Sequence, residues 1–127
     1  MAKKLLIVDD SPIARKMTKK ILPNKEDFEI FEATNGLEGL NKFKEISPDI
    51  TFMDLTMPVM DGLEALEEII KIDKNAIVIV STADVQPKSI SKVMSLGAFD
   101  VIRKPPKQEK FEEVMSEAFK KINSWGQ

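Results

Sequence analysis

Residues 50–66 read ITFMDLTMPVMDGLEAL, and the pattern on either side of this stretch predicts the fold class. Residues 50–53 form a continuous apolar run, which is typical of a strand buried on both faces. The run stops at Asp54, and a helix is predicted over 63–72 after the turn that contains Pro58. Because aspartate is rarely buried without a partner, Asp54 is either an ordinary strand-end residue or a charge placed there for chemistry.

The same strand–helix unit recurs along the whole chain. Apolar or alternating runs predict five strands, at residues 5–8, 28–33, 50–53, 76–80 and 99–102. Helical spacing of apolar residues predicts five helices, at residues 12–22, 37–46, 63–72, 88–96 with Gly97 as C-cap, and 111–122. This alternation predicts an α/β domain over residues 1–127, with a parallel sheet, right-handed crossovers and helices on both faces.

Composition excludes several classes of function. The 19 Lys and Arg residues against 21 Asp and Glu residues give a net charge of −2, which argues against direct nucleic-acid binding. The chain has no cysteine and no histidine, so thiolate chemistry is excluded and a hard cation would need oxygen ligands. The apolar run after the first lysines is too short for a signal peptide or a membrane span, which predicts a cytoplasmic protein without a membrane segment.

Polar side chains follow four of the predicted strands. They are Asp9 and Asp10, Asp54, Thr82, and Lys104. Each has an ordinary structural interpretation, such as a helix start or a solvated side chain. However, parallel strands bring their carboxyl ends to one edge of the sheet, where ligands bind. Three carboxylates about 4 Å apart repel by roughly 4 kcal/mol per pair at an effective dielectric constant near 20.

Such a cluster needs a divalent cation or shifted pKa values, and oxygen ligands favour Mg²⁺. Asp54 could then attack phosphorus as a nucleophile, while Thr82 and Lys104 would bind phosphoryl oxygens. Ser81 competes with Thr82 for the hydroxyl role. We favour Thr82, since successive strand side chains point to opposite faces.

These residues and their spacing resemble a family. The chain resembles a response-regulator receiver domain of the single-domain, CheY-like chemotaxis type. The matching segments are LLIVDDSPIARK (5–16), DLTMPVMDGLEAL (54–66), IVIVSTA (77–83) and LGAFDVIRKP (96–105). The resemblance implies a flavodoxin-like fold with strand order 2-1-3-4-5.

The resemblance also implies a role for each site residue. Asp54 would accept a phosphoryl group from a phosphohistidine on a histidine kinase or phosphotransfer protein. Asp9, Asp10, Asp54 and the backbone carbonyl of Thr56 would bind Mg²⁺. The absence of histidine fits, because the donor imidazole must come from another molecule. The protein would be a monomeric switch that signals to a downstream protein, not an enzyme that turns over a substrate.

Several positions bear on the output of such a switch. Val101 stands where the family often has Tyr or Phe, and valine has few χ1 states. Signalling would then use backbone and helix shifts, or Phe99 in part. Asp84 is expected to influence loss of the phosphoryl group or to be an exposed loop acid, and Lys104-Pro105 is expected to be a cis peptide. The surface of the fourth helix, fifth strand and last helix is expected to bind partners or only to be solvated through its basic residues, which are Lys88, Lys92, Arg103, Lys107 and Lys110.

Other interpretations weighed against a receiver switch differ in specific features. In haloacid-dehalogenase-like phosphohydrolases, which Asp54-Leu55-Thr56 faintly resembles, the nucleophile follows the first strand. A flavodoxin-like flavin site needs a Ser/Thr/Gly-rich loop where this chain has VDDSP, and a pseudo-receiver lacks one or more of the acids. A phosphorelay intermediate or sink, or the receiver fragment of a DNA-binding regulator, would have the same pattern as this chain.

Overall fold

The computed structural model describes residues 3–23 and 25–125 and confirms the alternation of strands and helices. Five strands and five α-helices follow one another, with a short 3₁₀ turn, η1 (Lys25–Asp27), before the second strand. The strands are β1 (Lys3–Val8), β2 (Phe28–Ala33), β3 (Ile50–Asp54), β4 (Val78–Thr82) and β5 (Asp100–Arg103). The helices are α1 (Pro12–Ile21), α2 (Gly36–Ile46), α3 (Gly62–Ile72), α4 (Pro87–Ser95) and α5 (Gln108–Trp125).

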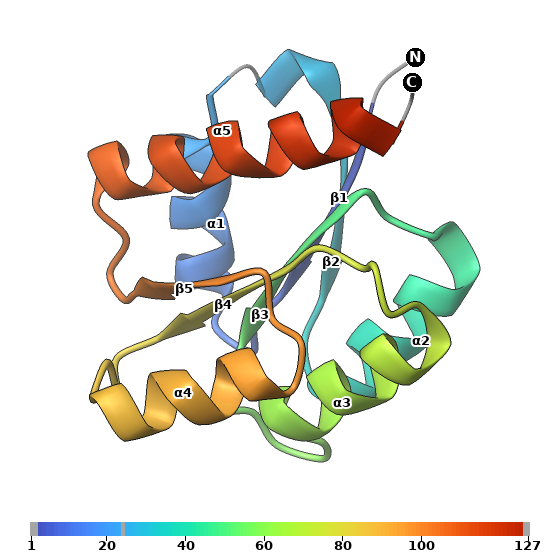
Figure 1. Cartoon of the computed structure of the whole chain (residues 1–127), viewed down its shortest axis with the longest axis vertical. Coiled ribbons are helices and arrows are strands. Elements are labelled where there is room, and N and C mark those ends of the chain that lie inside the picture. Colours follow the sequence, from blue (N-terminus) through green and yellow to red (C-terminus); the bar gives the residue numbers. More distant parts are fainter. Residues whose placement is uncertain (1–2, 24, 126–127) are drawn as a thin grey trace.

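All five strands are parallel, and their order is β2-β1-β3-β4-β5, as expected (Figure 1). The chain reverses its direction of winding at β1, which lies between β2 and β3. Val8 of β1 pairs with Met53 of β3, and Asp54 pairs with Ser81 of β4. The residues that follow β1 and end β3 therefore meet at the switch point, where open α/β sheets bind ligands.

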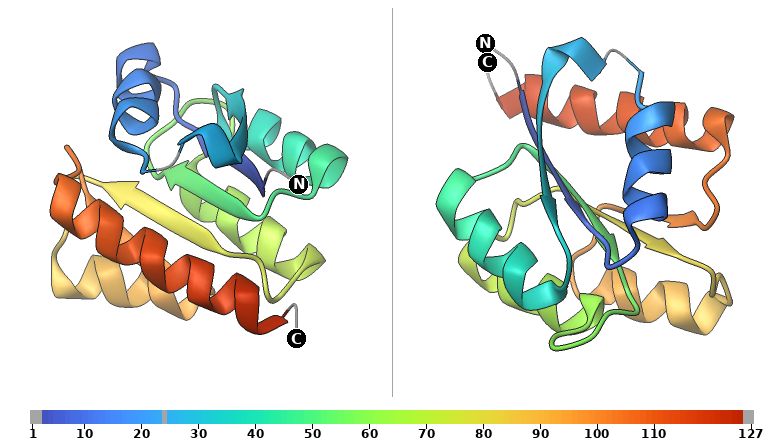
Figure 2. Two further views of the ribbon diagram at one scale, coloured as in Figure 1. Left: turned by 90° about the horizontal axis from the view of Figure 1, so that it is seen from above. Right: turned by 180° about the vertical axis from the view of Figure 1, so that it is seen from behind.

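Each face of the sheet is covered by its own set of helices. Helices α2, α3 and α4 lie on one face, and α1 and α5 lie on the other (Figures 1 and 2). The first layer buries Leu66 and Ile69 of α3 against Val80. The second buries Phe111 of α5, whose ring stacks on Phe52 with centroids 5.1 Å apart. Successive residues of each strand face opposite layers, so the inner strands β1, β3 and β4 are largely apolar, whereas the edge strands β2 and β5 also carry charged residues.

The predicted bounds of the fourth strand were wrong by two residues. The pattern predicted residues 76–80, but β4 spans Val78–Thr82. The Ala76 amide donates to the carbonyl of Asp73, which continues the turn after α3, and the ladder with β3 begins at the pair Thr51–Val78. Thr82 is therefore the last residue of its strand and does not lie two residues beyond the strand end.

The start of α1 and the end of α4 follow local signals in the sequence. Ser11 caps α1 through a hydrogen bond from the Ala14 amide, 3.1 Å long, and Pro12 occupies the first turn. Gly97 adopts φ 108° just after the end of α4, which confirms it as the residue that stops this helix. None of the described helices is both long and apolar enough to cross a membrane.

Candidate functional site

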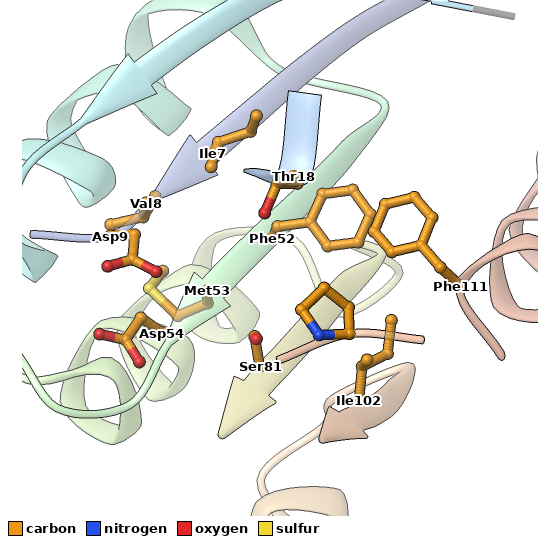
Figure 3. Close-up of a pocket in the computed structure, with 11 residues that line it drawn as sticks. Ile7, Val8, Asp9, Thr18, Phe52, Met53, Asp54, Ser81, Ile102 and Phe111 are labelled. Carbon is orange, nitrogen blue, oxygen red and sulfur yellow. The ribbon is translucent and has the colours of Figure 1, made fainter. Parts of the chain in front are cut away.

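Lys104 joins the ends of three strands into one site. Its Nζ lies 2.8 Å from Oδ2 of Asp9 and 3.2 Å from Oδ1 of Asp54. Asp9 follows β1, Asp54 ends β3, and Lys104 follows β5, so the sheet register brings them together. Figure 3 shows the carboxyl groups of Asp9 and Asp54 side by side at the edge of a pocket that also contains Ser81.

Asp9 and Asp10 form an acid pair after β1, and the structure holds their two side chains differently. Asp9 is 5% exposed, and its Oδ1 accepts a hydrogen bond of 2.9 Å from the Ser11 amide. The Asp9 backbone amide donates to the carbonyl of Ala33 in β2. Asp10 is exposed, and among the described residues no hydrogen bond or ion pair holds its carboxylate. Asp9 is thus fixed through its side chain and its backbone, whereas Asp10 is free to meet a ligand.

The acid cluster has the ligand chemistry of a magnesium site. One oxygen from each of Asp9, Asp10 and Asp54 lies within 4.8 Å of the others. Carboxylate oxygens are hard ligands, and Mg²⁺ is held by one or two carboxylates while keeping several waters. The exposed Asp10 leaves one side of the cluster open to solvent, which suits a hydrated cation. Thr56, the expected source of a carbonyl ligand, is exposed in the loop after β3.

Burial and neighbouring charges shift the pKa values of Asp54 and Lys104. Burial, then the neighbouring Asp9, raises the pKa of Asp54 above its ordinary range, although Lys104 opposes the shift. Burial alone would lower the pKa of Lys104, but its hydrogen bonds and attraction to Asp9 and Asp54 raise it overall. After burial, the negative charges of Asp9 and Asp10 also raise the pKa of Asp54, and a cation beside these acids would relieve that repulsion.

The two candidate hydroxyl groups lie in different environments. Thr82 is 8% exposed, and its Oγ1 accepts a hydrogen bond of 3.1 Å from the Asp84 amide. This contact uses a lone pair of the hydroxyl and leaves its hydrogen available for donation. Ser81 pairs with Asp54 across the strands and lines the pocket shown in Figure 3. Ser81, the next-to-last residue of β4, thus lines the same pocket as Asp9 and Asp54.

Comparison with known proteins identifies the family. The family model for the response regulator receiver domain matches residues 5–116. The chain belongs to the response-regulator receiver family. It is 43% identical over 121 residues to a chemotaxis protein CheY of Thermotoga maritima, covering 94% of this chain and 100% of that protein.

Solved receiver structures have the same fold. The crystal structure of a CheX–CheY–BeF3–Mg²⁺ complex from Borrelia burgdorferi contains a chain that matches with TM-score 0.86 at 34% identity, covering 92% of this chain and 89% of that one. The receiver domain of AraT from Geobacillus stearothermophilus matches with TM-score 0.90 at 28% identity, and both chains are covered completely. The protein is therefore a response regulator of two-component signalling by family.

The fifth strand has valine at position 101, where the receiver family often has Tyr or Phe. Val101 is half-buried against the layer formed by α2, α3 and α4. Phe99 packs against the other layer, with Nζ of Lys121 5.4 Å from its ring centre. The two residues therefore pack on opposite faces of the sheet, and Phe99 is partly buried against the layer formed by α1 and α5. The Lys104-Pro105 peptide is cis, as the resemblance implied.

The sequence did not reveal two features of the receiver site. Val59, in the loop after Asp54, has φ 70° and is 78% exposed, a conformation that is unusual for a β-branched residue. Arg15 of α1 donates to the carbonyl oxygen of Asp9 over 2.7 Å. As one polar residue among several in the predicted first helix, Arg15 carries no local signal for its contact with Asp9, and a valine gives no reason to expect a left-handed backbone.

Proposed function

We propose that this receiver domain is a phosphorylation-controlled switch with a chemotaxis-type role, and that Asp54 is its phospho-acceptor. The observation that carries the proposal is the position of the Asp54 carboxylate. It is 7% exposed at the end of β3, 3.2 Å from a lysine ammonium and within 4.8 Å of two further carboxylates. A carboxylate fixed in this way can serve as a nucleophile.

The reaction transfers a phosphoryl group between two proteins. A carboxylate oxygen of Asp54 forms a bond to phosphorus, and the phosphorus–nitrogen bond of a phosphohistidine breaks. The electron pair stays on the leaving imidazole nitrogen of the histidine kinase or phosphotransfer protein. Lys104, already beside the acceptor, offsets charge on the phosphoryl oxygens, and the Thr82 hydroxyl donates a hydrogen bond to one of them.

The carboxylates of Asp9, Asp10 and Asp54 would hold Mg²⁺, joined by the Thr56 carbonyl. Bound there, the cation supplies positive charge beside the transferring group and between the acids. Asp9 is held by Ser11 and Lys104, so it is oriented before any ligand binds. Asp84, whose amide contacts Thr82, lies where it would influence loss of the phosphoryl group.

We propose the α4–β5–α5 surface as the output face toward a downstream protein, with the receiver acting as a cytoplasmic monomer. Its five exposed basic residues form no ion pair within the described ranges, so they are available to an acidic partner: Lys88, Lys92, Arg103, Lys107 and Lys110. A pocket between β5 and the start of α5 is lined by three of these cations together with Pro105 and Pro106. In the Borrelia complex, a related CheY is bound to a protein partner, CheX.

The test is phosphorylation by a small donor. Incubation with acetyl phosphate and Mg²⁺ should add one phosphoryl group, about 80 Da by intact mass. Asp54→Asn should show no adduct, and chelation of Mg²⁺ should abolish it in the unchanged protein. Asp73→Asn is the matched control and should behave like the parent, because Asp73 follows α3 at the end of the helix opposite to the Gly62 end that approaches Asp54. An adduct that persists in Asp54→Asn would contradict the assignment.

A further inference from the structure

Arg15 connects helix α1, strand β2 and the acid pair in one contact network. Its Nη1 donates to the backbone carbonyl oxygen of Asp9 over 2.7 Å, and its Nε donates to Oε1 of Glu32 over 2.9 Å. The Arg15 side chain is 15% exposed, so most of it is buried between these partners. The second oxygen of Glu32 accepts from Nζ of Lys19 over 3.1 Å. Glu32 thus orients Arg15, and Arg15 alone of the two cations reaches the acid pair.

The carbonyl that Arg15 holds belongs to the peptide group between Asp9 and Asp10. A peptide group is planar, so fixing its oxygen also fixes the orientation of the Asp10 amide. Asp9 has other anchors, in the Ser11 amide and Lys104. Asp10 has none on its side chain within the described residues. The direction in which the Asp10 carboxylate leaves the backbone therefore depends on this peptide more than that of Asp9 does.

We propose that Arg15 is a positioning residue for the acceptor site, which fixes the Asp9–Asp10 peptide and thereby aims the Asp10 carboxylate at the cation. The planar guanidinium fork makes this possible, because it reaches the Asp9 carbonyl and the Glu32 carboxylate at once. A lysine ammonium is a single point charge on a flexible stem and cannot hold two partners in one plane. Arg15 acts through Asp10 and needs no contact with the cation or the phosphoryl group.

The charge of Arg15 and its positioning role predict opposite effects on magnesium binding. Removing a nearby positive charge should strengthen binding of a divalent cation, whereas releasing the peptide should weaken it. Lys19 supplies the matched control, because it pairs with the same Glu32 and carries the same charge but does not contact Asp9. A comparison at the two positions therefore separates orientation from electrostatics.

The Mg²⁺ part of the test rests on the proposed function. Mg²⁺ affinity is measured by calorimetric titration of the parent, Arg15→Met, Arg15→Lys and Lys19→Met. We expect both Arg15 variants to bind Mg²⁺ at least about tenfold more weakly, as is usual when a residue behind a metal ligand is lost. Lys19→Met should stay within about twofold of the parent. Urea unfolding confirms that each variant is folded, and Arg15→Lys alone carries the test if Arg15→Met is not.

The metal-free protein gives a second measurement. The amide of Asp10 shares its peptide group with the carbonyl that Arg15 holds, so its ¹⁵N chemical shift should move in both Arg15 variants and stay in place in Lys19→Met. Equal Mg²⁺ affinity and an unmoved Asp10 amide in Arg15→Lys would overturn the positioning role while leaving the phospho-acceptor intact. A parent that binds no Mg²⁺ would instead contradict the proposed magnesium site, and the Asp10 amide would still decide the role of Arg15.

Discussion

At the scale of single residues, the carboxyl groups of Asp54 and Glu32 have pKa values shifted in opposite directions. Asp54 is buried beside other carboxylates, and its pKa is raised. Glu32 is partly buried, which would raise its pKa, but the hydrogen bonds and the positive charges of Lys19 and Arg15 together outweigh burial and lower the pKa. The ionised carboxylate of Asp54 therefore destabilises the folded state, whereas the ionised carboxylate of Glu32 stabilises it. The sequence identified Asp54 from its place after an apolar run, but it gave no comparable signal for Glu32.

These opposite shifts predict opposite effects of neutral substitutions on stability. In metal-free protein, Asp54→Asn should increase the free energy of unfolding at neutral pH, and the gain should vanish as the pH falls to 3.8 and below, where the carboxyl is protonated in the folded and unfolded states alike. Glu32→Gln should decrease the free energy of unfolding at neutral pH. This decrease should persist down to pH 4.5 and should disappear as the pH falls through the lowered pKa of Glu32 in the folded state.

Urea unfolding from pH 7 downward, with a chelator present, measures both differences. A pH-independent effect of either substitution would show that packing rather than charge is responsible. An Asp54→Asn protein less stable than the parent at pH 7 would mean that Lys104 outweighs the repulsion and burial at this site.

At the scale of elements, the backbone at the start of α3 packs closely against the backbone of Asp54 and Leu55 at the end of β3. Asp61 caps α3 through the Glu64 amide, and the Gly62 amide donates to the carbonyl of Leu55. A Cβ at Gly62 would lie 2.1 Å from the carbonyl oxygen of Asp54. The sequence predicted a turn and a helix start here, but the need for a residue without a side chain follows only from the contact.

We therefore expect Gly62→Ala to destabilise the fold by about 2–3 kcal/mol, in the upper range for overpacking, because backbone must move. Gly39→Ala is the comparison, since its Cβ would meet only side-chain atoms of Val8, at 2.8 Å. It should cost less, about 1 kcal/mol, because a side chain can adjust more readily than a strand end. Urea midpoints measure the order, and a Gly39→Ala protein less stable than Gly62→Ala would contradict it.

At the scale of the whole molecule, a chain of hydrogen bonds links the site to helix α4. Thr82 Oγ1 accepts from the Asp84 amide, and the Asp84 carboxylate accepts from the Gln86 amide and from the Ser89 hydroxyl over 2.7 Å. The hydrogen bonds from Ser89 and then Gln86 lower the pKa of Asp84. Gln86, the N-cap of α4, makes no side-chain cap, so Asp84 and Ser89 hold the start of this helix. With valine at position 101, this link offers a route from the proposed acceptor site to the proposed output surface.

Ser89→Ala should therefore weaken signalling without weakening the site. In the parent, beryllofluoride with Mg²⁺ should shift backbone amide resonances around Asp54, in α4 and in α5. In Ser89→Ala the shifts around Asp54 should remain, while those in α4 should fall by about half or more, because the helix start is released from Asp84.

Ser95→Ala is the matched control for this measurement. Its hydroxyl donates to the carbonyl of Lys92 within the same helix, so its loss changes α4 without breaking the link. Equal reductions in both variants would show that α4 responds to any lost hydroxyl, and undiminished shifts in Ser89→Ala would exclude this route.

The sequence by itself determined how strands and helices alternate along the chain and which polar residues stand at the strand ends. Hydrophobic periodicity and helix-cap signals are local properties of the chain. It therefore predicted the site residues before any contact was known. Only the tertiary structure decided that Lys104 bridges Asp9 and Asp54, and that Arg15, Glu32 and the Asp9 carbonyl form one network. Except for Arg15 and Asp9, these contacts join residues far apart in the chain, and their geometry depends on strand register and helix packing, which no local pattern encodes.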